Sequence, residues 1–180
     1  MSAISQADTR RRFQAIDAAP TGQQRGQLLE DLANSILGSI PGMRFQDRRQ
    51  RNYFNSDEID LSHHNLRRRG GLESLDFPDF ILVECKHQRR PAGAIDVCWF
   101  LTKLLRRSLT FGILVSTTGI TGDADDLSEA HEIGAYFLQQ GIRLVVLTRT
   151  DLEAVKSHRE LVDLVHRRVA GLVLGFRLTD

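Results

Sequence analysis

Glu84 and Lys86 stand at the end of an apolar, strand-like run, ILVECK (residues 81–86). Side chains alternate between the two faces of a strand, so residues two apart share a face. An acid and a lysine at the end of so apolar a strand cost free energy unless they pair with each other or bind a metal ion. The spacing alone favours an ordinary ion pair at a strand end.

The preceding strand-like segment, residues 58–62, supplies a second acid. Polar and apolar residues alternate in it, which predicts a strand with Asp60 and the reserve candidate Glu58 on one face. If this strand pairs with the next one as a hairpin, Asp60 and Glu84 lie side by side. Two carboxylates and the ammonium of Lys86 then form a hard-oxygen site suited to Mg²⁺.

Two more acids are candidate ligands of this site. Asp79 precedes Glu84 by five residues, roughly 16–17 Å along one strand and on the opposite face, so it is too distant to share a metal ion. Glu30 lies on the flank of the apolar face of a helix predicted for residues 22–39. There its carboxylate either faces the sheet or is an ordinary boundary residue. Asp60 is therefore the preferred ligand.

Hydrophobic periodicity predicts the elements that position these residues. The predicted helices span residues 22–39, 94–108, 127–140 and 151–168 (the last as one or two helices), and the predicted strands span residues 43–46, 58–62, 80–86, 111–117, 142–147 and 172–176. Three strands come first, and helices alternate with strands afterwards. This order predicts the fold class α/β, as an α/β/α sandwich with a mixed central β-sheet.

The chain has 180 residues, enough for one domain with a core of its own. We expect a single domain over residues 21–180, with its core at about 22–150 and a helical extension at 151–180. Residues 1–20 are predicted to form an N-terminal arm or a short helix. Trp99, within the second predicted helix, is interpreted as a core residue.

Composition excludes several classes of protein. A formal net charge of +1, with 41% hydrophobic and 26% charged residues, is typical of a globular domain rather than a polybasic or disordered chain. No apolar run is long enough to span a bilayer, and the first residues lack the features of a secretory signal. Cys85 and Cys98 form no CxxC pair, so we expect a cytoplasmic protein without a cysteine-based zinc site.

Arginine dominates the positive charge of the chain. Only three of the 24 Lys and Arg residues are lysines, which codon usage explains as well as a preference for bidentate phosphate binding does. The arginines form three clusters around the predicted acidic site, namely Arg48, Arg49 and Arg51, then Arg67, Arg68 and Arg69, then Arg89 and Arg90. One such cluster is typical of a solvated surface, but three beside one acidic site favour contacts with nucleic-acid phosphates.

Two other motifs have weaker claims to a function. His63 and His64 point to opposite faces of one strand, so they do not easily bind one zinc ion, and we interpret them as polar residues of a strand end. Residues 116–119 follow a strand and could bind a phosphate at the start of a helix. They lack the lysine and glycine spacing of a P-loop, so a turn is the stronger interpretation.

Taken in order, these motifs resemble the PD-(D/E)xK nuclease superfamily. Glu30 with Gly26 on a helix, Asp60 in DEIDL, and Glu84 with Lys86 in ILVECK have the order and the element types of that superfamily. The chain is most similar to the Mrr-like restriction endonucleases and the archaeal Holliday-junction resolvases. FGILVSTTGIT and IRLVVLT resemble the fourth and fifth core elements of that branch, so the resemblance covers about residues 22–150. The chain departs from many Mrr-like members because the helix after its ECK motif contains no glutamine.

The resemblance implies a restriction-endonuclease-like fold and metal-dependent hydrolysis of DNA phosphodiester bonds. Asp60, Glu84 and the backbone carbonyl of Cys85 would hold Mg²⁺, or Mn²⁺ in its place. Lys86 would orient the attacking water, and Glu30 would assist through a water or a second ion. The implied partner is DNA, with a homodimer for double-strand cleavage and other protein subunits for specificity. The family also implies a role in restriction or defence against foreign DNA.

Two alternatives remain open at this stage. The first is a catalytically inactive nucleic-acid-binding or assembly module of the same fold, which a metal-binding measurement distinguishes. The second is a different α/β enzyme in which Glu84 and Lys86 form a structural pair. A wide separation of Asp60 from Glu84 would favour this second alternative.

Overall fold

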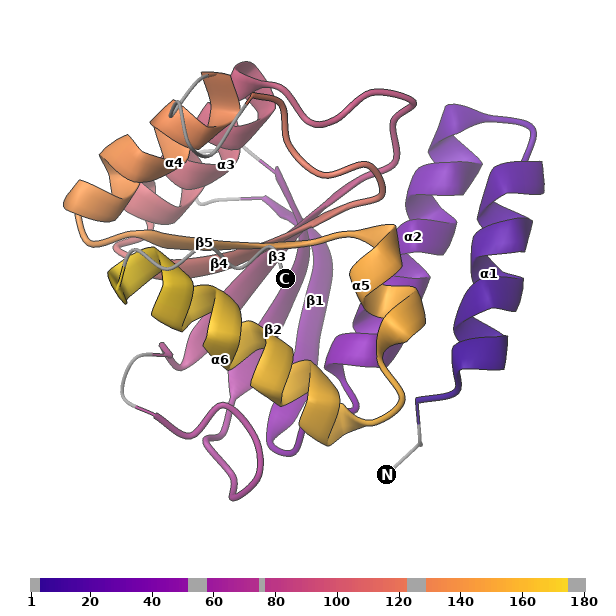
Figure 1. Ribbon diagram of the computed structural model, residues 1–180, viewed down its shortest axis with the longest axis horizontal. Coiled ribbons are helices and arrows are strands. Elements are labelled where there is room, and N and C mark those ends of the chain that lie inside the picture. The colour runs from indigo at the N-terminus through magenta and orange to yellow at the C-terminus, as the bar shows by residue number, and fades with distance from the viewer. Residues whose placement is uncertain (1–3, 52–57, 75–76, 123–128, 175–180) are drawn as a thin grey trace.

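The computed structural model describes residues 4–51, 58–74, 77–122 and 129–174, which form a five-stranded sheet between two layers of helices (Figure 1). The elements in chain order are α1 (Gln6–Ala18), α2 (Gly22–Leu37), β1 (Met43–Arg51), β2 (Glu58–Asn65), β3 (Phe80–Lys86), α3 (Ala94–Arg106), β4 (Phe111–Ser116), α4 (Glu129–Gln139), β5 (Arg143–Leu147), α5 (Arg149–Ala154) and α6 (His158–Leu174). Among the helices of these residues, none combines the length and the apolar character that crossing a bilayer requires.

The strands lie in the order β1-β2-β3-β4-β5 across the sheet. The first two pairings, β1 with β2 and β2 with β3, are antiparallel, whereas β3 with β4 and β4 with β5 are parallel. The parallel pairings require crossovers, which α3 and α4 provide. The predicted fold class, an α/β/α sandwich with a mixed sheet, is therefore confirmed, and it is consistent with a restriction-endonuclease-like fold.

The sheet separates two hydrophobic clusters. One lies between the sheet and the helices α1, α2, α5 and α6, and it includes Phe13, Leu29 and Ile113. The other lies beneath α3 and α4 and includes Phe100 and Leu114. Neighbouring residues of the fully buried strand β4 thus enter opposite clusters, as the alternation of side chains along a strand requires. Figure 1 shows α3 and α4 on one side of the sheet and α6 on the other.

Strand β1 is much longer than the predicted strand at residues 43–46. It continues to Arg51, so that Arg48 and Arg49 lie on a strand rather than in a connection. A register shift between Phe45 and Asp47 interrupts its pairing with β2. The prediction of a shorter strand was wrong, because it ended the strand where the charged residues begin. An edge strand keeps one side open to solvent and tolerates such residues.

Two further sequence predictions are wrong. Residues 172–174 belong to α6 rather than to a last strand, while residues 175–176 lie outside the described residues. Helix α6 buries Leu161, Val165 and Val169, a spacing of four residues that extends the helical pattern beyond residue 168. Trp99 is 55% exposed rather than buried in the core, because the core-facing positions of α3 are taken by smaller aliphatic residues and Phe100.

Helix α3 packs very closely on the sheet at Gly112 of β4. A Cβ atom at this position would lie 2.7 Å from Cδ1 of Leu104 and 2.9 Å from Cζ of Phe100. Both of these side chains are fully buried, so neither has room to move away. The absence of a side chain at residue 112 therefore sets the distance between α3 and the sheet.

We expect Gly112→Ala to lower the free energy of unfolding by about 1–3 kcal/mol, since it overpacks this contact. Gly134→Ala is the matched control, because a Cβ at this position of α4 meets no atom within 4 Å. Alanine there should instead raise the free energy of unfolding by about 0.5–1 kcal/mol, because glycine is unfavourable within a helix. Urea denaturation of both variants measures these changes, and equal stabilities would contradict the close packing of α3.

Candidate active site

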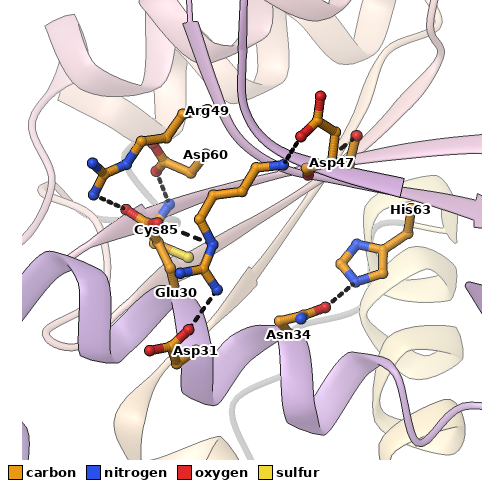
Figure 2. A network of polar contacts seen from close by, with 10 residues as sticks. Glu30, Asp31, Asn34, Asp47, Arg49, Asp60, His63 and Cys85 are labelled. Carbon is orange, nitrogen blue, oxygen red and sulfur yellow. Dashed lines mark hydrogen bonds and ion pairs between the residues drawn. The ribbon is translucent and has the colours of Figure 1, made fainter. Parts of the chain in front are cut away.

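Asp60 lies where the pairing of β2 with β3 ends. The last paired residues at this end are Leu61 and Val83, so Asp60 stands one residue beyond the ladder. Its side-chain Oδ2 accepts a hydrogen bond from the backbone N–H of Cys85 at 2.7 Å, and Figure 2 shows the carboxylate directed at that backbone. The carboxylate thus takes the place of a backbone acceptor and is fixed against the segment that carries Glu84.

The side chains of β2 do not alternate regularly around Asp60. Ile59 packs in the cluster beneath α3 and α4, whereas Leu61 packs in the cluster on the opposite side of the sheet. The prediction that the apolar residues of this segment share one face is therefore wrong. The hydrogen bond of Asp60 to Cys85 lies at the position where the strand changes face, which explains the departure from regular alternation.

Glu84 is a nearly buried carboxylate that is held by two lysines. It is 6% exposed. Its Oε1 lies 3.2 Å from Nζ of Lys86, as expected for residues on one face of a strand. Its Oε2 accepts a hydrogen bond from Nζ of Lys103 on α3 at 2.8 Å. Sequence reasoning missed Lys103, although a signal exists, because a separation of seven residues places it on the same face of the helix as Asp96.

Lys86 is shared between two carboxylates. Besides Glu84, its Nζ lies 3.6 Å from Oδ1 of Asp96 in the first turn of α3. Burial lowers the pKa of Lys86, but the neighbouring carboxylates of Glu84, Asp96 and Asp60 outweigh that effect and raise the pKa above its ordinary value. Lys86 is therefore a charged donor at neutral pH and not a proton acceptor.

Glu30 of α2 faces the sheet and is buried. Its Oε1 lies 3.5 Å from Nη2 of Arg49 (Figure 2). Its Oε2 lies 3.7 Å from Nε of Arg48, which also pairs with Asp31. Burial raises the pKa of Glu30 despite these two arginines. Within the described residues, Oε2 has no hydrogen-bond partner. The sequence left open whether Glu30 faces the sheet or solvent, and the structure places it against the sheet.

The three acids Glu30, Asp60 and Glu84 influence one another electrostatically. Burial, together with the charges of Glu84 and Glu30, raises the pKa of Asp60 to about 6 although its bond from Cys85 opposes the shift. Burial and the same three carboxylates raise the pKa of the Cys85 thiol well above its ordinary value. Negative charge therefore concentrates around the backbone of Cys85.

The chemistry of this donor set fits a hard divalent cation. Asp60 and Glu84 are carboxylates that repel each other, and Oε2 of Glu30 lacks a hydrogen-bond donor among the described residues. Mg²⁺ in proteins is commonly held by one or two carboxylates and keeps several waters. The described residues contain no group of three or more His, Cys, Asp or Glu side chains set to hold a metal ion. A cation here would rely on two carboxylates, the Cys85 carbonyl and water.

The predicted arginine clusters lie in different places. Arg48 and Arg49 contact Glu30, Arg51 lies 3.5 Å from Glu58, and Arg89 and Arg90 are exposed in the segment that follows Lys86. Arg67, Arg68 and Arg69 precede β3, so they lie at the opposite end of that strand from Lys86. The structure therefore pairs Arg48 and Arg49 with an acid of the site, leaves Arg89 and Arg90 exposed in the segment after Lys86, and separates the third cluster from the acids.

The separated cluster has local contacts of its own. Arg67 donates to the backbone carbonyl of Phe77 at 3.1 Å and lies 3.0 Å from Asp79, which places Asp79 away from the site as predicted. Arg68 and Arg69 line an open hollow of about 690 Å³ between the end of α2 and the start of β1. Arg67 thus fixes the segment before β3 rather than the acidic site.

His63 and His64 differ in environment. His63 is fully buried, and its Nε2 donates to Oδ1 of Asn34 on α2 at 3.0 Å (Figure 2). Burial lowers its pKa to about 4, so protonation of this ring opposes folding in acid. His64 is half-buried and stacks on Phe80. The two rings therefore have different surroundings and different partners.

No family model matches the chain, and the comparison with curated proteins returns no match. Among solved structures, the chain is similar to the DNA modification-dependent restriction endonuclease AspBHI, with 15% sequence identity and a TM-score of 0.43. The alignment covers 95% of this chain and 40% of that chain. This chain therefore spans less than half the length of that protein.

The raised pKa of Asp60 predicts a pH-dependent difference between the wild type and Asp60→Asn. The folded state binds this proton with a pKa of about 6, against 3.8 for an ordinary aspartate, so Asp60 adds stability as the pH falls between these values. The asparagine side chain keeps an acceptor for the Cys85 N–H but cannot titrate. From pH 6.5 to pH 4, we expect Asp60→Asn to lose roughly 2–3 kcal/mol more unfolding free energy than the wild type.

Urea denaturation without divalent cations across this pH range checks the prediction. Asp79→Asn is the matched control, because Asp79 is largely exposed and pairs with Arg67. Its pH profile should follow that of the wild type. A profile of Asp60→Asn that runs parallel to the wild type would show that Asp60 is not held in a buried, acidic environment.

Proposed function

We propose that this protein hydrolyses phosphodiester bonds of DNA with the help of Mg²⁺, for which Mn²⁺ can substitute. The observation that carries the proposal is the convergence of two acids and a lysine at the end of β3. Asp60 binds the backbone of Cys85 at 2.7 Å, and Glu84 lies 3.2 Å from Lys86. Carboxylates beside a charged lysine are the groups that metal-dependent phosphoryl chemistry requires.

In this proposal, Asp60, Glu84 and the backbone carbonyl of Cys85 hold the cation. When bound, such an ion polarises the phosphate and lowers the pKa of a coordinated water. The hydrogen bond from Cys85 to Asp60 and the burial of Glu84 hold the two carboxylates in position before any substrate binds. This rigidity favours catalysis, because groups held in place need no reorganisation during the reaction.

Lys86 and Glu30 complete the site with opposite roles. Lys86 remains protonated because of its neighbouring carboxylates, so it acts as a donor that orients water and stabilises negative charge on the phosphate. Glu30 has a raised pKa and an oxygen without a hydrogen-bond donor among the described residues, which suits the acceptance of a proton from water.

The cations around the acids favour a nucleic-acid substrate. Arg48 and Arg49 neutralise Glu30, and Arg89 and Arg90 are exposed just beyond Lys86, where they can contact phosphates. Cleavage of both strands of a duplex requires two such sites, so we propose a homodimer. Other subunits would supply sequence specificity. A cytoplasmic role in restriction or in defence against foreign DNA fits this activity.

A second candidate function is a catalytically inactive nucleic-acid-binding or assembly module. It is favoured by the pairing of both Glu84 oxygens with lysines, which leaves neither oxygen without a cationic partner. Such a module would bind DNA equally well in Mg²⁺ and in EDTA and would cleave it in neither. The nuclease proposal requires that a divalent cation bind to the wild type and that cleavage depend on it.

We expect Asp60→Asn, Glu84→Gln and Lys86→Ala each to reduce Mg²⁺-dependent DNA cleavage about 10²–10³-fold, the typical loss for one catalytic contact. Asp79→Asn should cleave at the wild-type rate, because Asp79 lies outside the site and pairs with Arg67. The assay incubates purified protein with linear, supercoiled, single-stranded and branched DNA, and with RNA, in Mg²⁺ or EDTA. Cleavage by Asp60→Asn at the wild-type rate would overturn the assignment.

A further inference from the structure

Lys103 makes a contact with the site that the proposed reaction does not explain. Its Nζ lies 2.8 Å from Oε2 of Glu84, closer than Lys86 lies to the other oxygen. Lys103 belongs to α3, and its side chain is only 13% exposed. A lysine with so little exposure must gain free energy from a specific partner. Within the described part of the chain, Glu84 is the carboxylate with which it forms an ion pair, and its charge also lowers the pKa of Asp60.

The two lysines on Glu84 are not equivalent. Lys86 lies on the same strand as Glu84, is 25% exposed and also pairs with Asp96. It can therefore face a substrate without losing every carboxylate contact. Lys103 has no such second contact among the described residues, and its helix is locked to the sheet by Phe100 and Leu104 above Gly112. The ammonium of Lys103 therefore forms its ion pair with Glu84.

Cations of the protein itself already pair with two of the three acids. The carboxylates of Glu30, Asp60 and Glu84 face the arginines that pair with Glu30 and the two lysines that pair with Glu84. A divalent cation that takes an oxygen of Glu84 must approach an ammonium already bound to that carboxylate. Repulsion between charges this close is large in a partly buried site.

We propose that Lys103 is a built-in counter-ion of Glu84 that competes with the divalent cation and so sets the affinity of the site for it. The inference rests on the proposed function, since it assumes that Glu84 is a metal ligand. In the absence of the cation, Lys103 neutralises Glu84 and stabilises the fold. In its presence, Lys103 opposes binding, so the site fills only at a higher cation concentration. Lys103 is in this sense a positioning residue that acts through Glu84.

The test is a titration of the full chain with Mn²⁺ alone, measured by isothermal titration calorimetry. Lys103→Met removes the charge but keeps an unbranched side chain, and we expect it to bind Mn²⁺ about tenfold more tightly than the wild type. Lys103→Arg keeps the charge and should bind Mn²⁺ with nearly wild-type affinity. Lys156→Met is the matched control, because it makes the same change at an exposed lysine between α5 and α6. It should leave the affinity for Mn²⁺ unchanged.

The outcomes separate this inference from the proposed function. If the wild type and Lys103→Met bind Mn²⁺ equally well, or if Lys103→Met binds it less tightly, Lys103 is a structural partner and the inference is wrong while the metal site stands. If neither protein binds Mn²⁺, both the metal site and the inference fail. If Lys103→Met does not fold, Lys103→Gln takes its place in the same titration, because it removes the charge and keeps a hydrogen-bond donor for Glu84.

Discussion

The burial of like charges around the backbone of Cys85 is the constraint on which the rest of the site depends. Asp60 and Glu84 both lie at the end of the β2–β3 hairpin, and Glu30 approaches from α2. Carboxylates in such surroundings cost free energy unless cations or hydrogen bonds compensate them. The raised pKa of Asp60 shows that this compensation is incomplete in the protein by itself.

The sheet and helix α3 contribute the compensating groups. The edge strand β1 supplies Arg48 and Arg49 to Glu30, α3 supplies Lys103 to Glu84, and β3 itself supplies Lys86. The architecture and the electrostatics are therefore coupled. A shift of α3 at Gly112 would move a cation away from Glu84, and a change in the pairing of β1 would move two cations away from Glu30.

Local sequence patterns were enough to predict the mixed sheet, most element positions and the shared face of Glu84 and Lys86. These features depend on the periodicities of strands and helices, which are visible in one segment at a time. Lys103 and the face change at Asp60 were not predictable in this way. The first depends on how α3 returns over the sheet, and the second on a hydrogen bond between two strands. The sequence prediction placed the arginines of β1 outside the strand, because charged residues usually mark a loop. An edge strand tolerates such charges.

The most direct test of the account is the titration of the Asp60 carboxyl carbon, observed by nuclear magnetic resonance with and without Mg²⁺. Without the cation, the account predicts a midpoint near the raised pKa of about 6. With saturating Mg²⁺, the midpoint should fall, because a bound cation favours the charged carboxylate. A midpoint near the ordinary aspartate value in both conditions would contradict the claim that Asp60 and its neighbours form a cation site.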